Sequence, residues 1–380
     1  MKILVINAGS TSIKFKFFEN QEELLMGQLS KEAHGVTKKI IKNGEKQKSD
    51  VEEYEFENAA QTILEITDSE IDKIGFRIVH GAEKFVEPTL LTSEVIEELE
   101  RISDLAPLHN PPALRIIRQF KEKLPEINMY GVFDTAFHAT IPQKAYMYGL
   151  PYEYYENYGV RKYGFHGISH KYVSGKLKEL EPTASKTIIC HLGGGSSITA
   201  VKSGKSIENS MGFTPLEGLI MATRSGDVDD GAIFYLHKKL GFDFAEIEEI
   251  ENKKSGMIGI SGISDDMVDL LAKESEGNER AHLAIEMYIY RIQKYIGFFA
   301  AALEGIDSVV FTGGIGAGSD VLRKRIMKNF LFLNFEVDDS INDEKINVSE
   351  NLKISVEPSK PIWVIPTNEE MQILKEIGDL

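Results

Sequence analysis

The stretch LVINAGSTSIKF, residues 4–15, decides the fold that this sequence predicts. It reads as an apolar strand, a turn of small residues and a second strand of alternating polarity, which is the pattern of a β-hairpin. The stretch IICHLGGGSSITAV, residues 188–201, repeats the pattern with one extra residue. Two similar hairpins, each opening a set of strands and helices, predict a duplicated two-domain α/β fold with an active-site cleft between its halves.

Hydrophobic periodicity locates the other elements around these hairpins. A long, largely buried helix is expected over residues 281–304, where apolar residues recur at helical spacing. An apolar strand that begins at Val309 ends in a third Gly-rich turn, GGIG at residues 313–316. Shorter helices are expected over residues 55–67, 93–103, 112–123, 229–240 and 368–377, and further strands over residues 24–30, 74–80, 128–133 and 361–366.

Length and composition exclude several classes of protein. A chain of 380 residues is too long for one ordinary core, so two domains are expected. The formal net charge of −16 argues against a nucleic-acid partner, because such binding depends on neutralising phosphates with Lys and Arg. A single cysteine, Cys190, excludes an internal disulfide framework and a Cys-rich zinc site. No stretch is long and apolar enough to span a bilayer, and the first residues read as a strand, so a soluble cytoplasmic protein without a membrane partner is expected.

The three Gly-rich turns suggest a binding site for phosphate. Backbone N–H groups in such turns can converge on a phosphate because no side chain blocks the approach. The hydroxyl groups of Ser10, Thr11, Ser12, Ser196 and Ser197 could add further donors. A single Ser/Gly hairpin turn is more often structural, so the inference depends on the three turns occurring together. Neither the Walker A pattern nor G-x-G-x-x-G is present.

Two arginines and two histidines occur in contexts that suit anion binding. Arg77 lies within an apolar strand, and Arg224 lies close to a glycine. Each is either a paired structural arginine or a clamp on phosphate or carboxylate, whose geometry and charge the guanidinium matches. His166 and His170 are four residues apart, so one helix face could hold both, as in a zinc site. Zinc is disfavoured because a third ligand is not evident, and a histidine that hydrogen bonds beside phosphate fits better.

Asp134 and the pair Glu369-Glu370 are candidate ligands for magnesium. Mg²⁺ typically takes one or two protein carboxylates and completes its shell with water and phosphate. Glu369 follows Asn368, a candidate helix N-cap, and acidic residues are common in the first turn of a helix. The local sequence alone therefore favours a structural role for Glu369.

A series of motifs resembles the acetate kinase family. The motifs run in the family's order over nearly the whole chain, from NAGSTSIK at residues 7–14 to TNEE at residues 367–370. Between them lie RIVHG (77–81), APLHNPP (106–112), FDTAFH (133–138), YGFHG (163–167), MGFTPLEGL (211–219), TRSGD (223–227) and FTGGIG (311–316). The resemblance implies the ribonuclease H-like fold shared by sugar kinases, Hsp70 and actin. It implies an N-terminal domain on the acyl-substrate side, residues 1–135 plus 366–380, and a nucleotide-binding domain, residues 136–365.

The resemblance also implies a reaction and its site residues. The reaction is reversible, Mg²⁺-dependent phosphoryl transfer between ATP and acetate by in-line attack of the carboxylate, with Mn²⁺ as an alternative metal. The phosphoryl group would be surrounded by Asn7, Arg77, Asp134, His166 and Arg224, and the metal would be held by Asn7 and Glu369. The acetate pocket would comprise Val79, Leu108, Phe165 and Pro215, beside Arg77. The cofactor-binding residues would be Ser10, Ser12, Lys14, His191, Gly193, Gly194, Gly195, Asp266, Gly313, Gly314, Ile315 and Gly316.

The chain departs from the family pattern chiefly near the expected nucleotide site. The third Gly-rich turn continues with Ala317-Gly318 where the family has Glu-Asn, and Val268 stands in the place of a family arginine. ATP is therefore expected to have fewer polar anchors on its base and ribose. The alternatives are a kinase for propionate or butyrate, one that uses pyrophosphate, and a catalytically inactive relative. The resemblance alone implies a homodimer.

Overall fold

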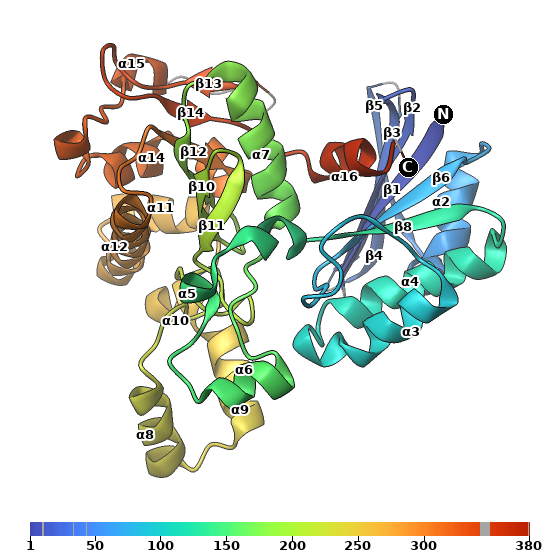
Figure 1. Cartoon of the computed structure of the whole chain (residues 1–380), viewed down its shortest axis with the longest axis horizontal. Coiled ribbons are helices and arrows are strands. Elements are labelled where there is room, and N and C mark those ends of the chain that lie inside the picture. Colours follow the sequence, from blue (N-terminus) through green and yellow to red (C-terminus); the bar gives the residue numbers. More distant parts are fainter. Residues whose placement is uncertain (10, 33, 43, 343–349, 379) are drawn as a thin grey trace. The chain divides into compact units, whose positions relative to one another are not determined.

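The computed structural model describes residues 1–380 apart from 10, 33, 43, 343–349 and 379 (Figure 1). The chain divides into two compact units. The N-terminal unit comprises Met1–Ala139 and Asn368–Leu380, and the second unit comprises Thr140–Thr367. The boundaries expected from the sequence lie after residues 135 and 365.

The N-terminal unit is built on one mixed sheet with the strand order β5-β4-β3-β2-β1-β6-β8-β7. Its strands are β1 Lys2–Ala8, β2 Ser12–Glu19, β3 Glu22–Glu32, β4 Gly35–Lys42, β5 Glu45–Val51, β6 Lys73–Ile78, β7 Thr89–Leu90 and β8 Asn128–Phe133. β1 pairs antiparallel with β2 and parallel with β6, which pairs parallel with β8. The first Gly-rich stretch therefore forms the predicted hairpin between β1 and β2.

Helices cover both faces of this sheet (Figure 1). They are α1 Glu53–Glu57, α2 Ala59–Thr67, α3 Ser93–Arg101, α4 Asn110–Lys123 and α16 Glu369–Gly378, with 3₁₀ turns at Ser103–Leu105 and Ala136–Thr140. Gly75 and Phe76 are adjacent in β6, so they face opposite sides of the sheet. A Cβ at Gly75 would lie 2.7 Å from Ile373, so α16 packs closely on that face. Phe76 contacts Phe120 of α4 on the other face, with ring centroids 5.8 Å apart.

The second unit repeats this strand order on a sheet of its own, β11-β10-β9-β12-β14-β13. Its strands are β9 Lys186–His191, β10 Ser197–Lys202, β11 Lys205–Asn209, β12 Ser308–Thr312, β13 Leu352–Lys353 and β14 Ile362–Val364. β9 pairs antiparallel with β10 and parallel with β12, which pairs parallel with β14. The sequence β3-β2-β1-β6-β8 of the N-terminal unit has the same pairing, so the duplication predicted from the two hairpins is confirmed.

In the second unit, α7 lies on one side of the sheet and α12 on the other, whereas α6, α8 and α9 extend away from the sheet (Figure 1). The α-helices are α5 Gln143–Tyr146, α6 Tyr152–Tyr158, α7 Gly167–Leu180, α8 Asp230–Leu240, α9 Phe244–Glu249, α10 Gly256–Ser261, α11 Met267–Ser275, α12 Glu279–Ala302, α13 Gly313–Gly318, α14 Asp320–Met327 and α15 Asp339–Asn342. A π-helical turn spans Ile250–Lys254 and a 3₁₀ turn spans Leu331–Leu333. The long α12 was predicted, and its buried face includes Ile285, Ile289, Ile292, Ile296 and Phe299. Within the described residues, no helix is long and apolar enough to cross a membrane.

Two predicted elements differ from the structure. The helix expected over residues 55–67 is interrupted at Asn58, whose φ and ψ of −104° and 44° are not helical. The Asn58 side chain donates to the carbonyl of Tyr54 at 3.0 Å, a local hydrogen bond of the kind that competes with helix continuation. The third Gly-rich stretch is a short helix, α13, because Ile315 N donates to the carbonyl of Leu192 at 2.9 Å and anchors the helix on the second hairpin.

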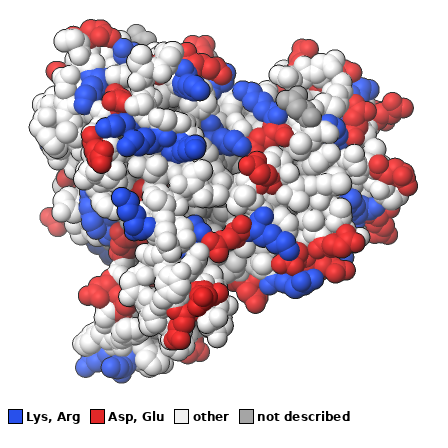
Figure 2. Space-filling view, in the orientation of Figure 1, with Lys and Arg blue, Asp and Glu red and all other residues white. Residues whose placement is uncertain are grey.

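Charged side chains of both signs are interspersed on the face of the molecule shown in Figure 2. Acidic residues exceed basic residues by 59 to 43 over the whole chain.

Candidate active site

Asn7, Arg77 and Asp134 lie side by side at one edge of the N-terminal sheet. Asn7 and Arg77 are near the ends of β1 and β6, and Asp134 directly follows β8. In the register of the sheet Asn7 pairs with Arg77, and Ile78 pairs with Phe133. The carboxyl ends of parallel strands meet at the same edge of a sheet, which is where α/β proteins bind their ligands. The structure thus brings together three of the residues predicted for phosphoryl transfer.

Arg77 is the centre of this cluster. Its Nε and Nη2 donate to Asp134 Oδ2 at 2.9 and 2.5 Å, and its Nη1 donates to Asn7 Oδ1 at 3.1 Å. Glu369 Oε2 lies 3.7 Å from the same Nη1. Burial opposes the charge, but the Asp134 and Glu369 carboxylates outweigh it and hold the pKa of Arg77 above its ordinary value. Arg77 is therefore paired within the protein, and its further role as a clamp on phosphate or carboxylate stays a prediction.

The oxygen atoms of this cluster suit a hard cation. Asp134 is 1% exposed, and its Oδ1 is buried without a hydrogen-bond partner in the described part of the chain. Asn368 Oδ1 accepts from Met371 N at 3.1 Å, so the predicted N-cap of α16 is confirmed, and Glu369 stands in the first turn. Among the described residues, no three His, Cys, Asp or Glu side chains are grouped to hold a metal. The donor set is of the sparse kind that Mg²⁺ uses when water and phosphate complete its shell.

Lys14 lies on the same side of the sheet as Asn7. The two residues are directly opposite in the antiparallel pair of β1 and β2, so their side chains share a face. Lys14 is exposed. Gly9 N donates to the carbonyl of Ser12 at 2.8 Å, which closes the turn of the hairpin. Ser10 lies outside the described residues.

In the second unit, two of the predicted histidines share the hydroxyl group of Ser197. His166 Nδ1 and His170 Nε2 lie 3.0 and 2.7 Å from Ser197 Oγ. His166 precedes α7 in a left-handed conformation with a φ of 57°. Its ring lies 4.5 Å from that of His191, whose Nδ1 hydrogen bonds with Ser169 Oγ at 2.8 Å. The sequence favoured a histidine that hydrogen bonds beside phosphate over a metal pair, and no local signal in it identified Ser197 as a partner of both rings.

Arg224 approaches His166 at the second Gly-rich loop. A Cβ at Gly195 would lie 3.4 Å from His166 Nε2 and 3.7 Å from Arg224 Nη1. Arg224 Nη1 donates to the carbonyl of Pro215 at 3.4 Å. No carboxylate of the described residues pairs with this guanidinium, and burial lowers the pKa of Arg224. A half-buried cation without an acidic partner favours an anionic ligand.

The second and third Gly-rich segments are in backbone contact. A Cβ at Gly313, which has a φ of +78°, would lie 2.5 Å from the carbonyl oxygen of Leu192, so only glycine fits there. A Cβ at Gly193 would lie 4.0 Å from Gly314 N. At Gly194 and Gly314, in contrast, an added Cβ would meet no atom within 4 Å, so both backbones are open to a ligand.

The hydroxyl groups of Ser196 and Ser197 have other roles than the one predicted. Ser196 Oγ donates to the carbonyl of Gly193 at 2.9 Å and lies 3.2 Å from the hydroxyl of Tyr288. Both serines are fully buried, and Ser197 serves the two histidines. The expectation that they donate to phosphate is therefore wrong, because protein groups already occupy them.

Asp266 is the N-cap of α11. Its carboxylate accepts from Val268 N at 2.7 Å and from Asp269 N at 3.4 Å. Val268, the position of the missing arginine, is 75% exposed. A capping role accounts for the carboxylate of Asp266, and its contact with a nucleotide stays a prediction.

The four residues predicted to hold acetate are divided between the units. Val79 and Leu108 belong to the N-terminal unit, and Phe165 and Pro215 belong to the second. Phe165 is 1% exposed, whereas Leu108 is 53% exposed. That the four enclose one acetate ion stays a prediction.

Comparisons with known proteins point to one family. The sequence profile described as the Acetokinase family matches residues 2–375. A protein of Bacteroides thetaiotaomicron named acetate kinase is 45% identical over 397 residues, covering 100% of this chain and 99% of that protein. The crystal structure of Porphyromonas gingivalis acetate kinase superposes with a TM-score of 0.92 at 40% identity, and that of a propionate kinase from Francisella tularensis subsp. tularensis with 0.93 at 36%. Both alignments cover 100% of this chain and 99% of the other. The fold is accordingly the two-domain α/β fold of the actin and sugar-kinase type.

Proposed function

Because the chain belongs to the acetate kinase family, we propose that it transfers a phosphoryl group reversibly between ATP and acetate, giving acetyl phosphate and ADP. The observation that carries this proposal is the environment of Arg224. Its half-buried guanidinium has no carboxylate partner among the described residues and lies beside Gly195 and His166 Nε2. These are the groups that an anionic phosphoryl group requires.

The chemistry requires charge neutralisation rather than proton abstraction. A carboxylic acid has a reference pKa of about 4, so acetate is already a nucleophilic anion at neutral pH. One acetate oxygen forms a bond to the γ-phosphorus while the bond from that phosphorus to the β-phosphate oxygen breaks in line, and ADP leaves with the electron pair. We assign Arg77, Arg224 and Lys14 to the charge on the phosphoryl oxygens, and Asn7 and His166 to hydrogen bonds with them.

Magnesium fits the N-terminal cluster. Asn7 and Glu369 would hold the ion, and the orphaned buried Oδ1 of Asp134 offers a further oxygen. When bound, Mg²⁺ offsets the negative charge of the phosphates and orients them, and Mn²⁺ has the same preference for oxygen ligands. Asp134 in addition keeps Arg77 oriented through the two hydrogen bonds to Oδ2.

The remaining residues are assigned by their place in the motifs. We assign the acetate methyl group to four apolar residues, and the nucleotide to the Gly-rich segments of the second unit, whose open backbones at Gly194 and Gly314 support that role. The N-terminal unit would then be the acyl-substrate side and the second unit the nucleotide side. The expected cleft stays a prediction. The residues for acetate are Val79, Leu108, Phe165 and Pro215, and those for the nucleotide are Ser10, Ser12, His191, Gly193, Gly194, Gly195, Asp266, Gly313, Gly314, Ile315 and Gly316.

We further propose that the protein is a homodimer that acts in the cytoplasm, where ATP is available. Support for a second copy comes from large apolar side chains exposed on the second unit. Phe234 and Tyr235 on α8, Phe244 on α9 and Tyr290 on α12 are each more than half exposed. Sedimentation equilibrium would give the mass of a dimer, and a monomer at micromolar concentration would reject this proposal.

The test of the activity is an assay of the purified protein with a panel of substrates. We expect the highest kcat/KM with acetate, a lower value with propionate and the lowest with butyrate, because a shallow pocket meets a longer chain with a steric wall. A preference for propionate would instead place this chain with the propionate kinase from Francisella tularensis. Activity with none of the three would support an inactive relative and reject the proposal.

A further inference from the structure

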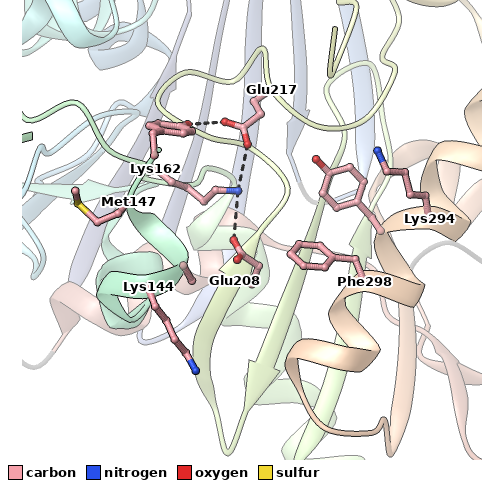
Figure 3. Close-up of a pocket in the computed structure, with 10 residues that line it drawn as sticks. Lys144, Met147, Lys162, Glu208, Glu217, Lys294 and Phe298 are labelled. Carbon is pink, nitrogen blue, oxygen red and sulfur yellow. Dashed lines mark hydrogen bonds and ion pairs between the residues drawn. The ribbon is translucent and has the colours of Figure 1, made fainter. Parts of the chain in front are cut away.

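A cluster of charges, Lys162, Glu208 and the partly exposed Glu217, lines a cavity of about 390 Å³ within the second unit (Figure 3). Lys162 is 8% exposed, and its Nζ lies 3.3 Å from both Glu208 Oε1 and Glu217 Oε1. The same Nζ donates to the carbonyl of Asn209 at 2.9 Å. One ammonium group therefore joins three residues that come from two separate parts of the chain.

On one side of this cluster, Glu217 holds the loop that contains Pro215 through a chain of hydrogen bonds. Glu217 Oε2 accepts from the hydroxyl of Tyr148, which in turn accepts from Phe213 N at 2.8 Å. Burial and the Glu217 carboxylate raise the pKa of Tyr148, so its hydroxyl keeps the proton that it donates. A Cβ at Gly212 would lie 1.7 Å from Glu217 Oε2, so the loop is folded tightly around this carboxylate.

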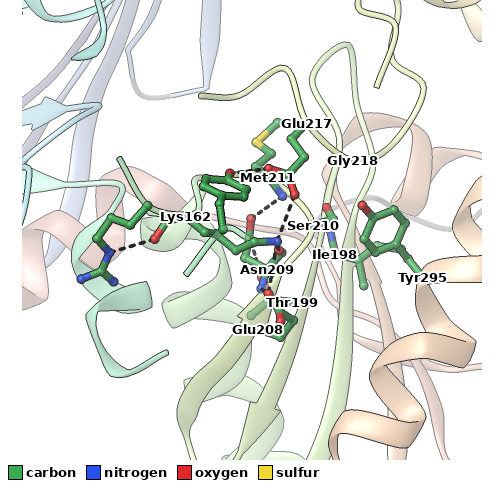
Figure 4. Close-up of polar contacts among 12 residues, drawn as sticks. Lys162, Ile198, Thr199, Glu208, Asn209, Ser210, Met211, Glu217, Gly218 and Tyr295 are labelled. Carbon is green, nitrogen blue, oxygen red and sulfur yellow. Dashed lines mark hydrogen bonds and ion pairs between the residues drawn. The ribbon is translucent and has the colours of Figure 1, made fainter. Parts of the chain in front are cut away.

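The Asn209 side of the cluster contacts the irregular segment that precedes His166, and Figure 4 shows Asn209 beside Lys162, where that segment begins. Asn209 Oδ1 accepts from Met211 N at 2.8 Å and from Phe165 N at 3.4 Å. Its Nδ2 donates to Thr199 Oγ1 at 2.7 Å. Phe165 directly precedes His166, so the hydrogen bonds of Asn209 bear on the position of both residues.

Both the Glu217 side and the Asn209 side of the cluster lead to residues that we assign to the substrates. The loop carries Pro215, whose carbonyl accepts from Arg224 Nη1 at 3.4 Å. The segment that begins at Lys162 leads to Phe165 and His166, and Tyr163 N donates to the carbonyl of Gly212 at 3.0 Å. We propose that Lys162, held between Glu208 and Glu217, is a positioning residue that sets the carboxylate-binding side of the active site. This inference rests on the proposed function.

The cluster requires the positive charge of Lys162 because it offsets the negative charges of Glu208 and Glu217. Burial raises the pKa of Glu208, and the Lys162 ammonium opposes that shift, so the two groups stabilise each other. Without the ammonium, two carboxylates would face each other in a partly buried space, and repulsion between them would move the loop of Pro215. Arg could replace Lys at this position because it keeps the charge and the donors.

The experiment compares Lys162→Met, Lys162→Arg and Glu217→Gln, with Lys144→Met as the matched control. Lys144 lines the same cavity but is exposed. In Lys162→Met we expect kcat/KM for acetate to fall about 10- to 100-fold, the size of effect that a small misplacement causes. The KM for acetate should rise, with a changed ratio of acetate to propionate, and kcat should fall because His166 is assigned to the phosphoryl oxygens, whereas the KM for ATP should be unchanged. Lys162→Arg should recover most of the activity, and Lys144→Met should match the wild type.

The outcomes separate this inference from the proposed function. A wild-type protein without carboxylate kinase activity would reject the function itself. Equal losses for acetate and ATP, or an unchanged KM for acetate in Lys162→Met, would reject the positioning role while the function stands. If Lys162→Met does not fold, Glu217→Gln decides the matter, because it removes one charge and keeps the shape. A wild-type KM for acetate in folded Glu217→Gln would then reject the inference.

Discussion

The two arginines assigned to the phosphoryl group differ in what surrounds them. Arg77 has its guanidinium held by Asp134 and Asn7, so its charge is compensated within the protein. Within the described part of the chain, Arg224 has a long hydrogen bond to the carbonyl of Pro215 and a contact of 3.8 Å to Met221 Sδ, and no carboxylate partner. Arg77 is thus part of a preformed network, whereas Arg224 is available to an incoming anion.

Arg224→Ala should lower kcat by about 10²- to 10³-fold, the usual loss for one preorganised donor to a transition state. Arg224→Lys should restore little, because an ammonium group cannot reproduce the planar fork of donors. Steady-state kinetics with saturating ATP and acetate would measure the effect. Arg118→Ala, which removes an exposed ion pair with Glu100, is the control and should leave kcat unchanged. A folded Arg224→Ala with the kcat of the wild type would remove Arg224 from the mechanism.

At the scale of elements, helix α16 depends on a glycine in the strand beneath it. A Cβ at Gly75 would lie 2.7 Å from both Ile373 and Ile377 of α16. Gly75→Ala should therefore lift the helix and with it Glu369, at a cost of about 1–3 kcal/mol in the free energy of unfolding. We expect lower kcat as well as lower stability. Urea unfolding and kinetics would check both, and Gly175→Ala is the control.

Gly175 lies in the middle of α7, where an added Cβ meets no atom within 4 Å. The control should therefore stabilise the protein by about 1 kcal/mol, since Ala is the better helix former. If Gly75→Ala also stabilises the protein, the close packing of α16 on β6 is not as described.

The connection that follows β6 contains a buried histidine with a pH-dependent effect on stability. His80 is fully buried, and its Nδ1 accepts from Ala82 N at 3.0 Å. The Asn110 side chain accepts from the backbone N–H of His80 and donates to its carbonyl. Burial lowers the pKa of His80 to about 4. The unfolded chain takes up a proton below pH about 6.5 and the folded chain only below about 4, so stability falls as the pH drops between these values.

This single group should reduce the free energy of unfolding by about 2 kcal/mol between pH 7 and pH 5. His80→Asn keeps an acceptor for Ala82 N and removes the titration. The variant should therefore lose less stability than the wild type over the same pH interval, as measured by urea unfolding. Parallel losses in the two proteins would show that His80 does not titrate in this way.

At the scale of the whole molecule, the sequence predicts what is periodic or local. The two hairpins predicted the duplicated fold because strand and turn signals act over a few residues. The N-cap at Asn368 and the long helix α12 were predicted for the same reason. The break at Asn58 and the helix α13 were not, since each depends on a specific hydrogen bond.

The features that could not be predicted from the sequence depend on contacts between residues that are distant along the chain. Lys162 and Glu217 are 3.3 Å apart in space, but in the sequence each resembles an ordinary surface charge. The roles of Ser196 and Ser197 were mispredicted because only the fold shows that their hydroxyl groups form hydrogen bonds within the protein, with Tyr288 and His170.

The choice of phosphoryl donor is a property of the whole second unit. The Gly-rich segments offer backbone only, with open space at Gly194 and Gly314, and the exposed Val268 stands in the place of a family arginine. Contacts to the phosphates are common to all nucleoside triphosphates, whereas contacts to the base distinguish them. We therefore expect weak discrimination between ATP, GTP and CTP. The measurement is kcat/KM for each at fixed Mg²⁺ and acetate, with pyrophosphate as a further donor.

A preference for ATP over GTP beyond about a hundredfold, near 2.7 kcal/mol, would contradict this expectation because it requires base-specific contacts. Activity with pyrophosphate alone would overturn the nucleotide assignment. Gly314→Ala tests the location independently, since its Cβ meets no protein atom and should not destabilise the fold. If the backbone at Gly314 meets the phosphates, the added methyl group should raise the KM for ATP, GTP and CTP together and leave the KM for acetate unchanged. Unchanged KM values for all three nucleotides would place the donor elsewhere.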